Sequence, residues 1–85
     1  MRKVTFSLKA FEQYQEWQLL DKKITQKINA LILETIRNPF EGSGKPEALK
    51  HELQGYWSRR INLEHRLVYK VTDDAIIIIA CKYHY

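Results

Sequence analysis

The stretch that decides the fold runs from Ala75 to Cys81 and reads Ala-Ile-Ile-Ile-Ile-Ala-Cys. Every side chain in it is apolar, and the isoleucines are β-branched, a composition that is typical of a strand. Because the run is apolar without alternation, it predicts a central strand that is covered on both faces, and we extend this strand to Tyr83. The run is too short to cross a bilayer, so we expect no membrane-spanning segment.

Upstream of this run, the sequence predicts three further strands. Residues 65–71 alternate, with Leu67, Tyr69 and Val71 on one face. Residues 48–53 and 56–61 are expected to be strands joined by a tight turn at Gln54-Gly55. The connections at 62–64 and 72–74 are too short for crossovers, so these strands should form an antiparallel meander.

The first half of the sequence predicts a short strand at 4–6 and two helices, with Ser7 and Asp21 as their N-caps. The apolar positions that share helical faces are Phe11, Tyr14 and Trp17, and then Ile24, Ile28, Leu31, Ile32 and Ile36. Asn38-Pro39 should end the second helix, because proline cannot continue its hydrogen bonds. The expected fold is α+β, with two N-terminal helices packed on a mostly antiparallel twisted sheet.

Composition narrows the class of protein. The length of 85 residues predicts a single domain spanning 1–85, and the start lacks the apolar core of a signal peptide, so we expect a cytoplasmic protein. The net charge of +4 suits a polyanionic partner such as RNA. Cys81, the single cysteine, is expected to be a buried small hydrophobe. The histidines lack zinc-ligand spacing, so we expect neither a metal nor a small-molecule cofactor.

Four features of the sequence have the chemistry of RNA cleavage. They are Glu47 after the glycine-rich loop 42–46, the basic residues Lys50, Arg59, Arg60 and Arg66, the penultimate residue His84, and the aromatic residues Tyr83 and Tyr85. Metal-free cleavage requires a base for the 2′-hydroxyl proton, an acid for the departing 5′ oxygen, and cations that stabilise the charged transition state. Aromatic rings stack bases and fix the reacting geometry.

Each feature alone also has an ordinary structural interpretation. A glutamate after a proline is usually a solvated loop residue, and a histidine near the C-terminus is more often frayed than catalytic. Arg59 and Arg60 point to opposite faces of a strand, so at most one is expected to meet RNA, while the other pairs with an acid or faces solvent. Residues 42–45 lack P-loop spacing, and we reject a nucleotide site there.

The last hairpin constrains any site that contains both Arg66 and His84. A two-residue loop at Asp73-Asp74 places Arg66 opposite Cys81, whereas a three-residue loop places Arg66 on the face of Lys82 and His84. A site that joins Arg66 to His84 therefore predicts an odd-length loop or a β-bulge in this hairpin. It also predicts that the C-terminal tail is held down on the sheet.

Several segments carry a resemblance to a known family. They are 38–47 (Asn-Pro-Phe-Glu-Gly-Ser-Gly-Lys-Pro-Glu), Lys50-His51, 55–61 (Gly-Tyr-Trp-Ser-Arg-Arg-Ile), 64–69 (Glu-His-Arg-Leu-Val-Tyr) and the ending 83–85 (Tyr-His-Tyr). With these segments in this order over essentially the whole chain, the sequence resembles the Txe/YoeB toxins of the RelE-like superfamily. The resemblance implies two helices on an antiparallel sheet, and a ribosome-dependent endoribonuclease that cleaves mRNA in the ribosomal A site.

The resemblance also implies roles for individual residues and for partners. It assigns Glu47 as the general base, His84 as the general acid, Arg66 as the transition-state cation, Tyr85 as a support for the histidine or a stacking ring, and Lys50 and Arg60 as phosphate contacts. It implies a cognate antitoxin whose disordered segment folds against the toxin, and it makes a homodimer plausible.

Two other functions stay open at this stage. One is a non-catalytic RNA- or ribosome-binding module that blocks translation by occupancy, and the other is an interaction protein that has lost its activity. The presence of the whole set of candidate groups argues against the first. The second would be expected to lack Glu47 or His84, and the sequence has both.

Overall fold

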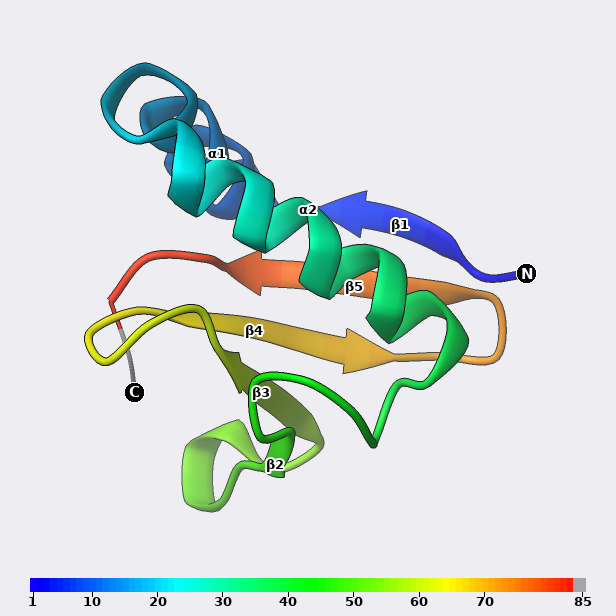
Figure 1. Ribbon diagram of the computed structural model, residues 1–85. Coiled ribbons are helices and arrows are strands. Elements are labelled where there is room, and N and C mark those ends of the chain that lie inside the picture. Colours follow the sequence, from blue (N-terminus) through cyan, green and yellow to red (C-terminus); the bar gives the residue numbers. More distant parts are fainter. Residues whose placement is uncertain (84–85) are drawn as a thin grey trace.

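The computed structural model describes residues 1–83, which form two α-helices, one 3-10 helix and a five-stranded sheet (Figure 1). In chain order the elements are β1 (Lys3–Phe6), α1 (Leu8–Leu20), α2 (Lys22–Arg37), β2 (Glu47–Ala48), the 3-10 helix η1 (His51–Leu53), β3 (Tyr56–Arg60), β4 (Arg66–Val71) and β5 (Ala75–Ala80). The strand order is β1-β5-β4-β3-β2, with β1 parallel to β5 and the remaining pairs of this sheet antiparallel. The predicted α+β fold with a mostly antiparallel sheet is confirmed.

Side-chain caps confirm both predicted helix starts. The Ser7 hydroxyl oxygen accepts a hydrogen bond from the Ala10 N–H at 3.1 Å. The Asp21 carboxylate accepts from two backbone N–H groups in the first turn of α2. Such caps satisfy N–H groups that have no partner within the helix. The second helix ends at Arg37, directly before Asn38-Pro39, as predicted.

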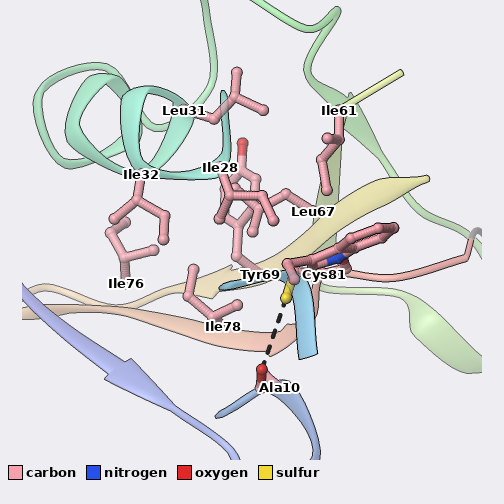
Figure 2. Packing of buried hydrophobic residues seen from close by; sticks show 11 residues of the cluster. Ala10, Ile28, Leu31, Ile32, Ile61, Leu67, Tyr69, Ile76, Ile78 and Cys81 are labelled. Atoms are coloured by element: carbon pink, nitrogen blue, oxygen red, sulfur yellow. Dashed lines mark hydrogen bonds between the residues drawn. The ribbon is translucent and has the colours of Figure 1, made fainter. Parts of the chain in front are cut away.

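Both helices pack on one face of the sheet, and the apolar core lies between these two layers (Figures 1 and 2). The buried cluster consists of Ala10, Trp17, Ile28, Leu31, Ile32, Ile61, Leu67, Tyr69, Ile76, Ile78 and Cys81. On β5, Ile76 and Ile78 are buried, whereas Ile77 and Ile79 are only half-buried. The prediction that β5 is covered on both faces is therefore wrong, because both helices lie on the same side of the sheet.

The predicted strand at 48–53 is also wrong. Strand β2 contains only Glu47 and Ala48, and the chain then turns into η1. The N–H of Leu49 still donates to the Tyr56 carbonyl at 2.9 Å. His51 then adopts a φ of 58°, a left-handed conformation that an extended strand does not contain. The apolar and polar pattern of this segment gives no sign of that reversal.

A β-bulge in the last hairpin confirms the predicted register shift. Tyr69 pairs with Ile78, but Val68 pairs with Ala80, so Ile79 is the inserted residue. The two-residue turn at 73–74 would otherwise have placed residue 66 opposite residue 81. With the extra residue, the N–H of β4's first residue, Arg66, reaches the carbonyl of residue 83 at 2.8 Å.

The predicted anchoring of the C-terminal tail is confirmed for residues 81–83. The Cys81 N–H donates to the Gln13 side-chain oxygen at 2.8 Å, and the Trp17 indole N–H donates to the Cys81 carbonyl at 2.9 Å. The N–H of Tyr83 donates to the His65 ring nitrogen Nδ1 at 2.7 Å. The tail is thus held between α1 and the start of β4.

Lys82 departs from the alternation that the sequence suggests. Strand β5 ends at Ala80 and not at Tyr83, so the strand period no longer sets the direction of the next side chains. The Lys82 ammonium turns towards α1 and lies 2.7 Å from the Glu16 carboxylate, a contact that raises the pKa of Lys82. Lys82 therefore does not share the face of Arg66.

The position of Cys81 yields a test of the core. Burial raises the pKa of this thiol to about 12, and its Sγ lies 3.6 Å from the Ala10 carbonyl oxygen (Figure 2). Because the thiolate is the reactive species, a disulfide reagent should modify the native protein at least about a hundredfold more slowly than the urea-unfolded protein at the same pH. Equal rates in the two states would show that Cys81 is not in the core.

Candidate functional site

Three of the predicted site residues lie on the sheet face that the helices leave open. Across the ladder, Glu47 pairs with Ser58 and Arg60 pairs with Arg66. Directly opposite residues share a face, and so do residues two apart on one strand, such as Ser58 and Arg60. Leu67, the neighbour of Arg66, points to the helices and is fully buried. Glu47, Arg60 and Arg66 are therefore grouped on the opposite face, which we call the open face.

Spacing on the open face is suitable for a single bound phosphodiester. Side chains directly opposite each other, as Arg60 and Arg66 are, begin about 4.5–5.5 Å apart, and diagonal neighbours begin about 7–8 Å apart. Glu47 is the diagonal neighbour of Arg60 across the short β2–β3 ladder. The side chains of Glu47, Arg60 and Arg66 are thus attached close enough to one another to contact a single nucleotide.

Glu47 is an exposed residue of the edge strand β2. Among residues 1–83, its carboxylate makes neither a hydrogen bond nor an ion pair. Glu47 and the three residues that follow it, up to Lys50, line a hollow in the surface. The Glu47 oxygens are therefore available as proton acceptors.

Arg66 is oriented by the turn that precedes β4. Its Nη1 donates to the carbonyl of Asn62 at 2.9 Å and to the carbonyl of His65 at 3.2 Å. Asn62 in turn caps this turn, with its side-chain oxygen accepting from the N–H groups of residues 64 and 65. Within the described part of the chain, no carboxylate pairs with Arg66. The Arg66 guanidinium is thus oriented by backbone carbonyls, and its charge is not paired with any described carboxylate.

Arg60 and Lys50 are both exposed. The backbone N–H of Arg60 donates to the Gly44 carbonyl at 2.6 Å, which ties the end of β3 to the loop before Glu47. Gly44 has a φ of +80°, and an added Cβ would lie 2.9 Å from the Arg60 carbonyl oxygen, so glycine suits this close approach. The charged ends of Arg60 and Lys50 make no ion pair with any described residue.

Arg59 has the opposite environment, because it is completely buried. Its Nε donates to the Tyr69 hydroxyl at 3.2 Å, and its Nη1 donates to Glu34 at 2.7 Å and to the Ser43 carbonyl at 3.2 Å. Its Nη2 donates to the Asn38 and Glu41 carbonyls. All five guanidinium donors are used. Arg59 is therefore the arginine that pairs with an acid, and it cannot contact RNA.

This buried arginine shapes the loop that leads to Glu47. Its partners Asn38, Glu41 and Ser43 all belong to the 38–46 segment, and the Tyr69 hydroxyl adds a bond to the Pro39 carbonyl at 2.7 Å. The sequence pattern predicted that one of the two arginines pairs with an acid or faces solvent, but it did not identify Arg59, Glu34 or the loop carbonyls. Those partners are distant in sequence, and nothing in the periodicity points to them.

Two ionisable groups that contact Arg59, the Glu34 carboxyl and the Tyr69 phenol, have shifted pKa values. Hydrogen bonds from the Ser43 N–H and hydroxyl, followed by the contact with Arg59, hold the pKa of the Glu34 carboxyl below its ordinary value. Burial raises the pKa of the Tyr69 phenol, although Arg59 opposes the shift. Both groups therefore keep, near neutral pH, the forms that the network requires: an ionised carboxylate and a neutral phenol.

Two of the predicted site residues, His84 and Tyr85, lie outside the described residues. In residues 1–83 no three His, Cys, Asp or Glu side chains converge in a way that would hold a metal. None of the helices in this part of the chain is both long and apolar enough to span a membrane. The groups of the open face are thus a carboxylate and cations, which suit proton transfer and the binding of a phosphate.

Comparisons with known proteins agree with this fold and show the family. The family model described as the YoeB-like toxin of bacterial type II toxin–antitoxin systems matches residues 6–85. Toxin YoeB of Escherichia coli (strain K12) is 59% identical over 83 residues, which cover 98% of this chain and 99% of that protein.

Solved structures of similar proteins have the same fold as this chain. The YoeB dimer from Staphylococcus aureus superposes with a TM-score of 0.93 at 56% identity, covering 99% of this chain and 98% of that one. The toxin in a heterotetrameric YoeB–YefM toxin–antitoxin complex from the same species gives a TM-score of 0.91 at 56% identity, covering 100% and 99%. Two helices on one face of a mostly antiparallel five-stranded sheet are thus a fold that this chain shares with bacterial toxins. The chain belongs to the YoeB-like toxin family of type II toxin–antitoxin systems.

The buried network predicts a large difference between two adjacent arginines. Arg59→Met should lower the free energy of unfolding by about 3–5 kcal/mol, because it leaves Glu34 and several loop carbonyls without their partner. The matched control Arg60→Met, on the open face, should change it by less than about 0.5 kcal/mol. Urea unfolding followed by tryptophan fluorescence measures both, and equal losses would contradict the assignment of Arg59 as the structural arginine.

The lowered pKa of Glu34 predicts a pH dependence of stability. Because the folded pKa lies below the unfolded one, Glu34 contributes stability above the unfolded pKa, and this contribution is lost as the pH falls through the folded pKa. Urea unfolding at several acidic pH values should therefore show a steeper loss for wild type than for Glu34→Gln. The exposed control Glu12→Gln should follow wild type, and parallel curves for wild type and Glu34→Gln would refute the prediction.

Proposed function

We propose that this toxin is a metal-independent endoribonuclease that cleaves mRNA in the ribosomal A site. The observation that carries the proposal is the grouping of Glu47, Arg60 and Arg66 on the open face. The bulge supports it as well, because it brings the Tyr83 carbonyl onto the Arg66 N–H, directly before His84 in the sequence. The candidate base thus lies on the same face as Arg66, and the chain that leads to the candidate acid is bound to the backbone of Arg66.

The proposed reaction is an attack by the 2′ oxygen on the adjacent phosphorus. Glu47 takes the 2′-hydroxyl proton as the O2′–P bond forms, and His84 donates a proton to the 5′ oxygen as the P–O5′ bond breaks. The products are a 2′,3′-cyclic phosphate and a free 5′-hydroxyl. Arg66 stabilises the added negative charge of the transition state, and Tyr85 supports His84 or stacks on a base. A histidine changes charge near neutral pH, which suits the acid role.

Arg60 and Lys50 are proposed as contacts to flanking phosphates. Both are exposed and make no ion pair within residues 1–83, so they can exchange their counterions for a phosphate. Arg59 has no such role, because its donors are used inside the protein. The single domain expected from the sequence would present all of these groups to mRNA held by the ribosome in the cytoplasm.

The proposed protein partners come from the similar proteins. The solved Staphylococcus aureus toxins include a YoeB dimer and a heterotetrameric complex with YefM. We infer that this chain likewise binds a cognate antitoxin, whose disordered segment folds on the toxin and blocks the open face. A homodimer is proposed on the same likeness.

Mapping of mRNA 5′ ends by primer extension in translation reactions tests the function. Wild type should leave new ends at ribosome-occupied codons. Glu47→Ala, Arg66→Ala and His84→Gln should each reduce the cleavage rate by about a hundredfold or more, because each removes a proton-transfer or charge-stabilising group. The exposed controls Glu12→Ala and Arg37→Ala, on the helices, should cleave as wild type does.

Two outcomes would redirect the proposal. If translation stops but no new ends appear with wild type, the protein blocks the ribosome by occupancy and is not a nuclease. If wild type cleaves and all three open-face and tail variants cleave equally well, the enzyme is real but its active site lies elsewhere.

A further inference from the structure

Tyr83 is bound through both polar atoms of its backbone. Its N–H donates to the His65 Nδ1 at 2.7 Å, and its carbonyl accepts from the Arg66 N–H at 2.8 Å. Tyr83 also has a φ of 64°, a left-handed conformation that is uncommon for a residue with a side chain. His65 and Arg66, two adjacent residues at the start of β4, therefore hold the last described residue in an unusual backbone conformation.

His65 is a buried side chain that the proposed reaction does not use. It is 6% exposed, and its ring lies edge-on to the Trp17 ring, with centroids 4.8 Å apart. Because Nδ1 accepts a hydrogen bond from a backbone N–H, this nitrogen must be unprotonated, which assigns the ring proton to Nε2. The Nε2 atom lies 3.6 Å from the Glu64 carboxylate.

We propose that His65 is a positioning residue whose unprotonated Nδ1 holds the backbone of Tyr83 beside Arg66. The inference rests on the proposed function, since Tyr83 directly precedes the candidate acid His84 in the sequence. His65 acts through the backbone of Tyr83 and does not touch the substrate.

The position of His65 in the chain makes this role physically direct. His65 and Arg66 are neighbours, so the residue that grips the tail is covalently joined to the residue that supplies the cation. Displacing a catalytic group by about 1 Å can cost about a hundredfold in rate. A tail released from His65 would keep its bonds at Cys81 but lose one of the two backbone hydrogen bonds of Tyr83, the residue before His84.

Protonation of the His65 Nδ1 would remove its hydrogen bond to Tyr83. A proton on Nδ1 would place a donor against the Tyr83 N–H, which is also a donor, and the contact would be lost.

Two substitutions separate the acceptor from the ring. In His65→Asn, the side-chain oxygen can occupy the place of Nδ1 and accept from Tyr83, and it does not titrate. In His65→Leu, the apolar volume is retained but the acceptor is lost. Ile28→Val, in the core of α2, controls for destabilisation without contact to the tail.

Amide hydrogen exchange at Tyr83 and cleavage by primer extension are the two readouts. His65→Leu should reduce the Tyr83 protection factor by about tenfold or more and reduce the cleavage rate with it, since the Tyr83 N–H loses its acceptor. His65→Asn should restore both, and Ile28→Val should behave as wild type in both readouts.

Several results would overturn the inference. Unchanged Tyr83 protection in His65→Leu would show that the acceptor does not hold the tail, and lost protection with undiminished cleavage would show that holding it does not matter. Should His65→Leu not fold, ¹⁵N chemical shifts of the wild-type ring decide, because an Nδ1 that carries the proton at neutral pH refutes the grip. If wild type leaves no cuts at all, the proposed function fails, while the exchange data still decide whether His65 binds Tyr83.

Discussion

The hydrogen bonds of the Arg59 guanidinium hold the loop before Glu47 in place, and the rest of the structure depends on them because this loop has no regular secondary structure of its own. Every N–H of that group binds an oxygen from α2, from the 38–46 segment or from Tyr69. Removing an arginine from water is costly, and only such complete pairing repays the cost. The same network sets the direction in which the chain enters β2.

Alternation along β3 explains how adjacent arginines acquire opposite roles. Arg59 points to the helices and orders the loop, whereas Arg60 points to the open face and stays solvated. A shift of one residue in the β3 register would exchange their positions, burying Arg60 and exposing Arg59. The Glu34 carboxylate and the Gly44 contact oppose such a shift from two sides.

Features that depend on local chemistry were predictable from the sequence, and those that depend on distant contacts were not. The Ser7 and Asp21 caps and the end of α2 follow from residue types at fixed offsets, and the need for a bulge followed from counting along a hairpin. The reversal at His51 arises from a backbone conformation that no pattern signals. The Arg59 network and the grip of His65 on Tyr83 join residues from different elements, so periodicity alone misses them. The sequence named Glu47, Arg60 and Arg66 as candidates, but only the strand register shows that these three residues share a face of the sheet.

The pairing of β1 with β5 joins the first strand of the chain to the last. Trp17 and Gln13 of α1 likewise bind the backbone of Cys81, so the N-terminal helix completes its contacts only with residues that are synthesised much later. A nascent chain therefore cannot close its sheet while it is still being elongated. The sheet, and with it the face that carries Glu47, Arg60 and Arg66, would in this way remain incomplete until the segment that contains β5 and Cys81 has left the ribosome.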